Sequence, residues 1–226
     1  MSSSTKIIAI DGPAGSGKST TARMVAKILG FTFLDTGAMY RAVTLFALEQ
    51  KVPLLDAGAL EQIASSIQID FGENEDGQKV FADGRDITSD IRTAEVTDAV
   101  SEVSAHAGVR RHMVAKQREM GDKYNIVAEG RDTTSVVFPH ATLKIYLLAS
   151  IEERARRRVI DFQRMGKITT VQEQIKAIRA RDEYDSRRQN SPLQQTRDSI
   201  AVDTTKLTIE DQVNKIISLF REKTRA

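Results

Sequence analysis

A glycine-rich stretch at residues 12–20, Gly-Pro-Ala-Gly-Ser-Gly-Lys-Ser-Thr, constrains this chain more than any other part of its sequence. It fits the pattern G-x-x-x-x-G-K-[ST], with Gly12, Gly17, Lys18 and Ser19 at the defining positions. Glycines accept positive φ and leave no Cβ between the backbone amides and a bound oxyanion. The stretch therefore predicts a loop that wraps a polyphosphate.

The flanking sequence supports this interpretation. Residues 6–11 form a short apolar run typical of a buried strand, and residues 20–29 carry apolar side chains at helical spacing. The helix would direct its unpaired amides and the positive end of its dipole at the anion. We expect Lys18 to reach the β- and γ-phosphates of ATP and the Ser19 hydroxyl to ligate Mg²⁺. The loop residues expected to bind ATP are Gly12, Pro13, Ala14, Gly15, Ser16, Gly17, Lys18, Ser19 and Thr20.

The composition argues against several classes of protein. Thirty-three basic and 31 acidic residues leave a formal net charge of +2, too small to suggest bulk binding of nucleic acid. Without cysteine the chain has no disulfide and no thiolate metal site. No segment reads as a secretion signal, and no apolar run approaches the roughly 18 residues of a membrane span. We expect a cytoplasmic monomer that binds small molecules, with no nucleic-acid or membrane partner.

Expected strands alternate with helices along the chain. The strands are expected at residues 6–11, 31–34, 125–129, 142–148 and 199–202. The helices are expected to begin at Thr20, Thr36, Asp56, Ala94, Ser150, Thr169 and Thr208, with Thr36 as an N-cap and capping boxes at 150–153 and 169–172. This order predicts an α/β protein of the P-loop NTPase fold, with a five-stranded, mostly parallel sheet and helices on both faces.

The pattern changes between residues 66 and 93. Apolar and polar residues alternate here, interrupted by turn signals at 73–77 and 83–84, which predicts a small three-stranded antiparallel insert. We expect a single domain with a core of residues 1–65, 94–150 and 190–226, the insert at 66–93, and a helical lid with its following helix at 151–189.

A second informative stretch is Asp35-Thr-Gly-Ala-Met-Tyr-Arg41. Together with residues 9–20, it closely resembles the start of the bacterial cytidylate kinases, which are nucleoside monophosphate kinases. Further matches are Asp90-Ile-Arg92, Glu129-Gly-Arg-Asp132, Val136-Val-Phe-Pro139, Glu153-Arg-Ala155, Arg157-Arg158 and Arg181-Asp182. The resemblance covers nearly the whole chain, including the insert, which resembles that family's monophosphate-binding region. It implies an enzyme that transfers the γ-phosphoryl group of ATP to CMP or dCMP, with Mg²⁺.

Two positions depart from the family's pattern. Glu129 stands where the family usually has Asp, and Thr133-Thr134 replaces the usual Met-Gly or Ile-Gly. We expect the longer carboxylate to shift a contact to Mg²⁺ or to the loop. The change from glycine to threonine is expected to restrict the backbone near the substrate site.

Phosphoryl transfer depends on positioning and charge neutralisation, and arginine suits this because it binds phosphate bidentately and keeps its charge. Arg41 and Arg131 lie near the carboxyl ends of expected strands, the edge where ligands bind in open α/β sheets. The resemblance implies substrate contacts from Thr36, Arg41, Ser101, Arg110, Arg131, Asp132, Arg181, Asp185 and Arg188. It further implies catalytic roles for Lys18, Arg131, Asp132 and Arg158, and an ATP contact from Arg157.

The string Asp-Gly-Arg-Asp at residues 83–86 matches the family's usual motif better than residues 129–132 do. Residues 83–86 occupy a predicted hairpin turn, where glycine and charged residues are expected for local reasons. We therefore place the site at 129–132, directly after a core strand, and expect Arg85 to be structural.

Helix geometry limits the remaining assignments. Ser101 and Arg110 would lie on opposite faces of an unbroken helix, so both reach one pocket only if the helix is interrupted, for which Gly108 offers a break. Arg181 and Asp185 share one helix face with Arg188, and a surface ion-pair ladder is the alternative interpretation.

The helices on either side of Gly166 resemble the lid that closes over ATP in nucleoside monophosphate kinases and excludes water from the reaction. Arg157 and Arg158 are its best candidates for ATP contacts, against the alternative of a solvated basic face.

Two other functions remain open at this stage. The first is a kinase of the same architecture for UMP, AMP or shikimate, because only the resemblance selects cytosine. The second is a nucleotide-binding regulator or nucleic-acid-associated ATPase, against which the near-neutral charge argues. His106, His112 and His140 lack metal-ligand spacing and are expected to play polar structural roles.

Overall fold

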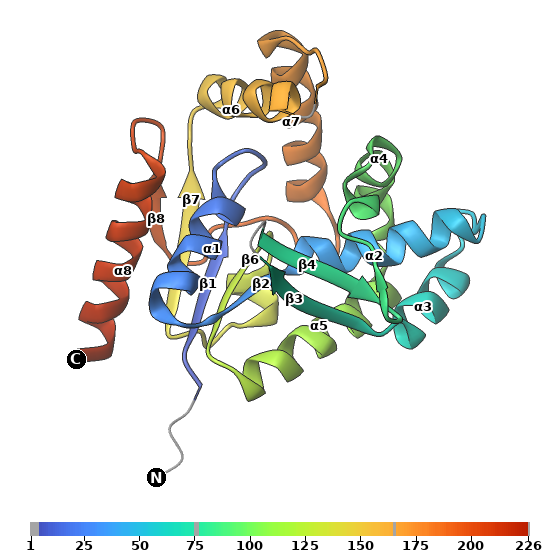
Figure 1. Ribbon diagram of the computed structural model, residues 1–226, viewed down its shortest axis with the longest axis horizontal. Helices are drawn as coiled ribbons and strands as arrows, with labels where there is room; N and C mark the ends of the chain where they lie inside the picture. The colour runs from blue at the N-terminus through green and yellow to red at the C-terminus, as the bar shows by residue number, and fades with distance from the viewer. Residues whose placement is uncertain (1–4, 75–76, 165, 226) are drawn as a thin grey trace. The chain divides into compact units, whose positions relative to one another are not determined.

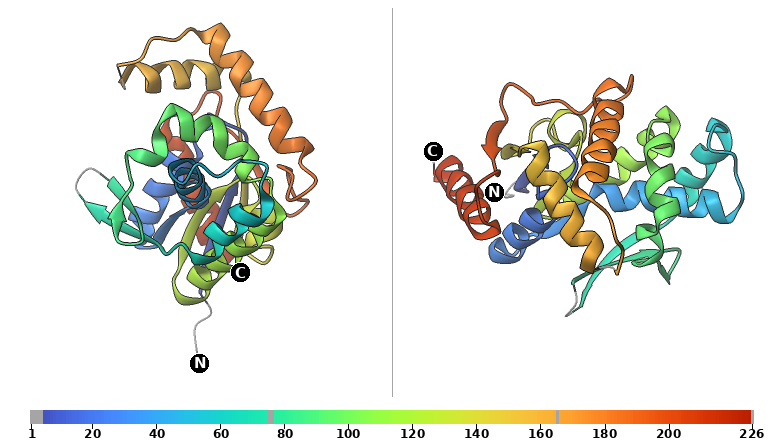
Figure 2. Two further views of the ribbon diagram at one scale, coloured as in Figure 1. Left: turned by 90° about the vertical axis from the view of Figure 1, so that its right-hand side faces the viewer. Right: turned by 90° about the horizontal axis from the view of Figure 1, so that it is seen from above.

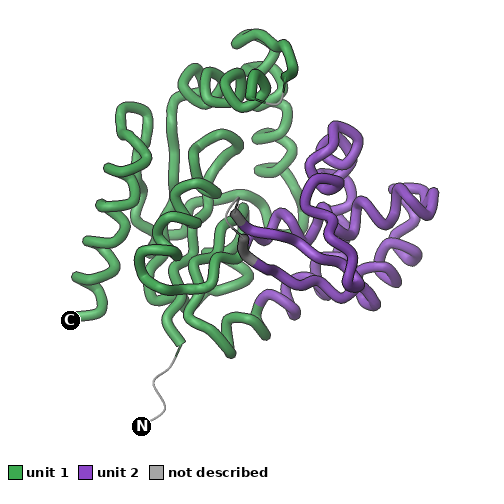
Figure 3. Tube along the Cα trace, in the orientation of Figure 1, with its two compact units in different colours: residues 1–34, 118–226 green, residues 35–117 purple. Residues whose placement is uncertain are grey.

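The computed structural model describes residues 5–74, 77–164 and 166–225. The chain divides into two compact units, residues 1–34 with 118–226 and residues 35–117 (Figure 3). The first unit carries the glycine-rich loop, and the second contains the predicted insert, whose exact limits of 66–93 stay a prediction. Among the described helices, none is both long enough and apolar enough to span a membrane.

A five-stranded sheet forms the centre of the first unit (Figure 1). In spatial order its strands are β2 (Thr32–Asp35), β6 (Ile126–Gly130), β1 (Ile7–Asp11), β7 (Leu143–Leu148) and β8 (Ile200–Asp203). β1 pairs in parallel with β6 and β7, and β7 pairs in parallel with β8. The predicted α/β class and central sheet are confirmed, with each strand beginning one residue later than expected.

One face of this sheet is covered by α1 (Lys18–Leu29) and α8 (Ile209–Arg225), which lie side by side (Figures 1 and 2). Ile8 and Ile10 of β1 join a buried cluster with Val25 of α1. The residues of α8 expected to point inward are all buried, namely Val213, Ile216, Ile217 and Phe220. Burial of apolar surface stabilises a fold by about 25 cal/mol per Å² removed from water. Burial of this cluster therefore holds α1, and with it the loop, against the sheet.

The opposite face of β1 meets different elements. Ile7 lies against Gly121 in α5 (Ala107–Lys123), where a Cβ would lie 2.5 Å from the ring of Phe138, so only glycine allows the approach. Asp11 contacts η2 (Thr133–Val137), a single π-helical turn. The sequence did not predict η2, and such turns occur frequently at functional sites.

α6 (Ile151–Arg164) and α7 (Val171–Arg187) pack on each other in the first unit (Figure 2). α7 begins at a capping box formed by Thr170 and Glu173, one residue later than the box predicted at 169–172. The reason is chemical, because the Glu173 carboxylate accepts hydrogen bonds from both the amide of Thr170 and the hydroxyl of Thr169.

At α6 only half of the predicted capping box forms. Ser150 accepts a hydrogen bond from the amide of Glu153 at 3.3 Å, but the Glu153 carboxylate turns to Arg157 instead of returning to the helix start. The predicted end of this helix at Met165 lies outside the described residues.

The second unit combines helices with a small sheet (Figure 3). Its elements are α2 (Thr36–Glu49), α3 (Ala57–Ser66), β3 (Ile69–Asn74), β4 (Gly77–Ala82), β5 (Arg85–Asp86), η1 (Asp90–Arg92), α4 (Ala94–Val103) and the first part of α5. β4 pairs antiparallel with both β3 and β5, which confirms the predicted three-stranded sheet. Strand pairing continues to Asn74 and Gly77, inside the limits of the turn predicted at 73–77, and residues 75–76 lie outside the described ranges.

Two local predictions in this unit are wrong. Asp35, rather than Thr36, is the N-cap of α2, because its carboxylate accepts from the amide of Ala38 at 2.9 Å. The predicted helix at 94–121 is two helices, and the break lies at residues 104–106 rather than at Gly108. Gly108 lies inside α5, where a Cβ would lie 2.3 Å from a carboxylate oxygen of Glu61.

Candidate active site

The glycine-rich loop follows β1, which lies in the middle of the five-stranded sheet. Gly12, Gly15 and Gly17 have φ angles of 152°, 76° and 94°, a region that side chains disfavour. At Gly12 a Cβ would lie 2.1 Å from the carbonyl oxygen of Leu147, so no side chain fits. α1 begins directly behind the loop at Lys18, and the amides of its first turn point toward the space that an anion would fill.

The Lys18 side chain is buried beside the loop, and its Nζ donates to the carbonyl oxygen of Pro13 at 2.9 Å. Burial first, and the positive charge of Arg131 second, lower the pKa of Lys18 to about 7. The carboxylates of Glu129 and Asp11 act in the opposite direction. An amine in this state gains from an approaching polyphosphate, whose negative charge favours the protonated form.

Ser19, the predicted Mg²⁺ ligand, donates its hydroxyl to Oε1 of Glu129 at 2.7 Å. Glu129 is buried near the end of β6, the neighbour of β1. The described residues contain no group of three or more His, Cys, Asp or Glu side chains arranged to hold a metal by themselves. A hydroxyl and a carboxylate oxygen side by side fit Mg²⁺, which keeps several waters and shares its coordination with substrate phosphates.

Asp11 ends β1 with a fully buried carboxylate that accepts four hydrogen bonds. Thr133 donates its amide and hydroxyl to Oδ1 at 2.9 and 2.7 Å, and Thr134 donates the same groups to Oδ2 at 2.7 and 2.6 Å. Burial raises the pKa of Asp11, although the threonine donors oppose it. The change to threonine, expected only to restrict the backbone, therefore adds hydroxyl donors that fasten the chain directly after Asp132.

Asp185 of α7 gathers three of the predicted substrate-binding arginines. Its carboxylate accepts from Nε of Arg131 at 3.0 Å and lies 3.9 Å from both Nε of Arg181 and Nη1 of Arg188. The side chains of Asp185 and Arg188 are only 4% and 5% exposed, unlike those of a surface ion-pair ladder. Three guanidinium groups around one carboxylate leave an excess of positive charge suited to phosphate.

Two details qualify this arginine cluster. Arg188 is the C-cap of α7 and lies just beyond the regular helix, so the predicted shared helix face holds only for Arg181 and Asp185. Burial acts to lower the pKa of Arg131, but the charges of Asp185 and Glu129 outweigh it and raise that pKa overall. Arg131 therefore keeps its charge.

Two side chains from the α6–α7 pair hold the backbone of one loop residue, Ala14. The amide of Ala14 donates to Oδ1 of Asp182 at 3.0 Å, and Nη1 of Arg154 donates to the Ala14 carbonyl oxygen at 3.0 Å. The same Nη1 donates to Oδ2 of Asp182 at 2.5 Å, which closes a ring of contacts.

The two predicted lid arginines differ in their surroundings. Arg157 donates to the loop carbonyl of Ser16 at 3.3 Å and to the carbonyl oxygen of Thr204 at 2.7 Å. Arg158 places its guanidinium 5.3 Å from the ring centre of Phe162 in its own helix. Arg157 thus lies at the loop, whereas the described contact of Arg158 is with α6 itself, and the ATP contact of Arg157 stays a prediction.

The other predicted substrate residues, Thr36, Arg41, Ser101 and Arg110, belong to the second unit. Thr36 is buried as the first residue of α2. Arg41 donates to the carbonyl oxygen of Ile91 at 3.2 Å and to the hydroxyl of Thr97 at 2.9 Å. Arg41 is therefore anchored by neighbouring elements and is not a solvated helix side chain.

Arg110 is 5% exposed, and its guanidinium lies 5.0 Å from the ring centre of Tyr40. Its Nη1 donates to the carbonyl oxygen of Ser104, in the break between α4 and α5. Ser101 lies half-buried in α4, before the break. The helix interruption that the Ser101 and Arg110 assignments require is thus present, at residues 104–106 instead of at Gly108.

The rejected string at 83–86 lies in the small sheet. Arg85 forms exposed ion pairs with Glu49 at 2.6 Å and Asp90 at 3.5 Å, and its guanidinium lies 5.6 Å from the ring centre of Phe46. These contacts agree with a structural role for Arg85.

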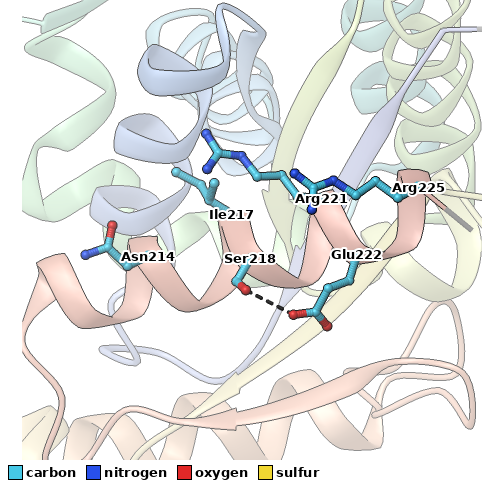
Figure 4. A pocket seen from close by; sticks show the side chains of 6 residues that line it. All are labelled: Asn214, Ile217, Ser218, Arg221, Glu222 and Arg225. Atoms are coloured by element: carbon cyan, nitrogen blue, oxygen red, sulfur yellow. Dashed lines mark hydrogen bonds between the residues drawn. The ribbon is translucent and has the colours of Figure 1, made fainter.

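A hollow of about 320 Å³ lies elsewhere, along α8 (Figure 4). It is lined by Asn214, Ile217, Ser218, Arg221, Glu222 and Arg225. None of the predicted site residues contributes to it, and the hydroxyl of Ser218 donates to Glu222 within it. The candidate site is therefore defined by the loop and its contacts.

The sequence model of the cytidylate kinases, described as "Cytidylate kinase", matches residues 8–222. The chain belongs to the cytidylate kinase family. It is 47% identical over 216 residues to a cytidylate kinase of Lysinibacillus sphaericus, covering 96% of each chain. It is 43% identical over 218 residues to a cytidylate kinase of Bacillus subtilis, covering 96% of this chain and 97% of that one. A gluconokinase structure from Sinorhizobium meliloti shares the fold, with a TM-score of 0.50 and 14% identity over 96% of this chain and 92% of that one.

Sequence reasoning missed several residues of this cytidylate kinase site. Asp11 directly precedes the loop, so its position at the end of β1 was an available signal. Glu129, the next-to-last residue of β6, was not missed, because its carboxylate was expected to contact Mg²⁺ or the loop. Arg154 and Asp182 lie in the family-like strings 153–155 and 181–182, but no spacing in the sequence indicates that they meet, because 28 residues separate them and only the packing of α6 on α7 joins them. Tyr146 pairs in register with Asp11, and burial, followed by the charge of Asp182, raises the pKa of its hydroxyl.

Proposed function

We propose that this cytidylate kinase transfers the γ-phosphoryl group of ATP to CMP or dCMP, giving ADP and CDP or dCDP. The match of the family's sequence model over residues 8–222 carries the choice of acceptor. The loop with its three positive-φ glycines and buried Lys18 supports ATP as the donor.

The donor half of the site is residues 12–20. Their amides bind the phosphates, and Lys18 adds a cation where the β- and γ-phosphates lie. Ser19 and Glu129, whose oxygens lie side by side, would hold Mg²⁺, and the ion would supply positive charge that neutralises the phosphates of ATP. Arg157 lies against the carbonyl oxygen of Ser16, where it borders the nucleotide.

In the first unit the acceptor half consists of Arg131, Arg181, Arg188, Asp132 and Asp185. The substrate contacts that the family resemblance implies for Thr36, Arg41, Ser101 and Arg110, which belong to the second unit, stay predictions. The arginines bind the monophosphate, and the carboxylates of Asp132 and Asp185 accept from the pentose hydroxyls. Arg131 is fixed by Asp185 before any substrate arrives, so little reorganisation is needed when charge develops.

Catalysis in this scheme consists of positioning and charge stabilisation. Lys18 and Arg131 stabilise the transferring phosphoryl group, Asp132 orients the acceptor, and Arg158 approaches from α6. The α6–α7 pair acts as the lid and excludes water, so transfer to the monophosphate competes with hydrolysis. The monomeric state and cytoplasmic location stay predictions.

One coupled assay tests the proposal. ADP formation from MgATP is measured with CMP, dCMP, UMP, AMP, shikimate or no acceptor. CMP and dCMP are expected to accelerate it well above the other acceptors. Equal rates with and without CMP would overturn the proposal, and stimulation by DNA or RNA in its place would indicate a nucleic-acid-associated ATPase.

A further inference from the structure

The ring of contacts around Ala14 joins three parts of the chain. Ala14 lies between the positive-φ glycines Gly12 and Gly15, and both polar groups of its backbone are engaged by side chains. Asp182 accepts from the amide and Arg154 donates to the carbonyl, while the two side chains bond to each other.

The surroundings make this ring rigid. The side chains of Arg154 and Asp182 are 10% and 20% exposed, and Nε of Arg154 also donates to the carbonyl oxygen of Ala149 at 3.1 Å. A Cβ at Gly15 would lie 3.1 Å from both Cβ and the carbonyl oxygen of Arg154, so the backbone of α6 lies directly against the loop. Charge-assisted hydrogen bonds in a sheltered place are stronger than neutral ones.

We propose that Asp182 and Arg154 are positioning residues for the nucleotide: they fix the two peptide groups that flank Ala14 and thereby orient the loop amides that follow. The inference rests on the proposed function, because it concerns the ATP half of that site. Neither residue needs to touch ATP. Their effect passes through the backbone of residues 14–18, which has to present several amides to one polyphosphate at once.

The ring also links the two halves of the site within the first unit. Asp182 follows Arg181 on α7, so the helix that holds the loop peptide also carries Arg181 and Asp185. Asp185 in turn holds Arg131 at 3.0 Å. A displaced backbone at Ala14 would therefore affect nucleotide affinity first and the arginine cluster second.

The chain offers a matched control. Glu183 and Arg187 form an ion pair of 2.7 Å on the same helix, but their side chains are 57% and 79% exposed. Exposed pairs contribute little to stability, so the Glu183 and Arg187 variants report the loss of an exposed ion pair on the same helix. A purely structural role for the sheltered pair of Asp182 and Arg154 predicts a lower thermal midpoint with nucleotide affinity unchanged. A positioning role predicts an effect on nucleotide binding at Asp182 alone.

The test uses Asp182→Asn, which is nearly isosteric, and Arg154→Lys, which keeps the charge but removes the guanidinium, with Glu183→Gln and Arg187→Lys as controls. Affinity for a non-hydrolysable MgATP analogue is measured by calorimetry, together with the KM for ATP, the KM for CMP, and the thermal midpoint. We expect Asp182→Asn and Arg154→Lys to weaken analogue binding and raise the KM for ATP about tenfold, equivalent to about 1.4 kcal/mol. The KM for CMP is expected to change less than twofold.

Analogue affinity within twofold of the unmodified protein in folded Asp182→Asn would overturn the inference. So would equal losses in Asp182→Asn and Glu183→Gln. If Asp182→Asn fails to fold, Arg154→Lys, which retains the positive charge, decides by the same criterion. Because analogue binding requires no acceptor, failure of the inference stays distinguishable from absence of CMP-dependent turnover.

Discussion

Thr134 donates two hydrogen bonds to one oxygen of the buried carboxylate of Asp11, from its amide at 2.7 Å and from its hydroxyl at 2.6 Å. Asp11 ends β1 and leads into the loop, whereas Thr134 follows the predicted catalytic pair Arg131 and Asp132. The contact therefore ties the glycine-rich loop to the segment that carries Arg131. It also explains how the chain tolerates threonine where its family usually has glycine.

Replacing Thr134 by valine should destabilise the fold by about 2 kcal/mol, because a hydrogen bond to a buried charged group is lost while the shape is kept. Denaturant unfolding measures the change. Thr44→Val is the control, since the Thr44 hydroxyl is equally buried but bonds to the neutral carbonyl of Tyr40. A larger loss in Thr44→Val than in Thr134→Val would contradict the special role of the contact with Asp11.

The raised pKa of Asp11 determines whether its contribution to the free energy of unfolding rises or falls with pH. Because burial raises its pKa above the ordinary 3.8, the folded state binds more protons than the unfolded state above that value. The contribution of Asp11 to stability should therefore fall as pH rises from about 4 through its folded pKa. The slope of unfolding free energy against pH should be more positive in Asp11→Asn than in the unmodified protein over this interval, and an unchanged slope would contradict the shift.

Arg131→Ala should lower kcat on the order of 10³-fold, by analogy with other arginines that stabilise a transferring phosphoryl group. Steady-state kinetics at saturating ATP and CMP measure the effect. Arg85→Ala is the control, because it removes the arginine of the better-matching string from an exposed ion pair. A near-normal rate for Arg131→Ala, or a large loss of rate for Arg85→Ala, would contradict the assignment of the site to residues 129–132 instead of 83–86.

Much of this arrangement follows from local sequence. The loop is predictable because its backbone conformation requires glycine at several positions. The strands are predictable because short apolar runs bounded by turn residues indicate buried strands. The same reasoning placed Arg131 at the edge of the sheet. It rejected Arg85 because a hairpin turn supplies its own reason for glycine and charge.

The remainder depends on contacts between distant residues. Asp35 displaced Thr36 as a cap because a carboxylate one residue earlier reaches the Ala38 amide. Arg154 and Asp182 meet through helix packing, which no spacing in the sequence reveals. The role of Thr134 as a donor to Asp11 was hidden for the same reason, so its departure from the family pattern suggested only backbone restriction.

Nucleotide binding should be accompanied by proton uptake at Lys18. Its pKa of about 7 leaves the amine mostly neutral at pH 8, and bound polyphosphate restores the charged form. Calorimetry with MgADP at pH 8 in buffers of different ionisation enthalpy should show uptake of about one proton, falling to a small fraction at pH 6. Lys27→Met, a change at an exposed lysine of the same helix, should leave the uptake intact. A binding heat independent of the buffer at pH 8 would contradict the lowered pKa.

Glu129→Gln should raise the Mg²⁺ concentration needed for half-maximal activity by about tenfold or more, as for other groups that orient a metal ligand. The side-chain amide of glutamine still fits beside Ser19. It lacks the negative charge with which the Glu129 carboxylate attracts a divalent cation and accepts from the Ser19 hydroxyl. Glu152→Gln, at an exposed glutamate of α6, serves as the control. Glu129→Asp restores the residue usual in the family and should retain most of the affinity, because the carboxylate is kept at a slightly shorter reach. If Glu129→Gln instead lowered the thermal midpoint without changing the Mg²⁺ requirement, the contact with Ser19 would be structural, and the metal would be held by Ser19 and the nucleotide alone.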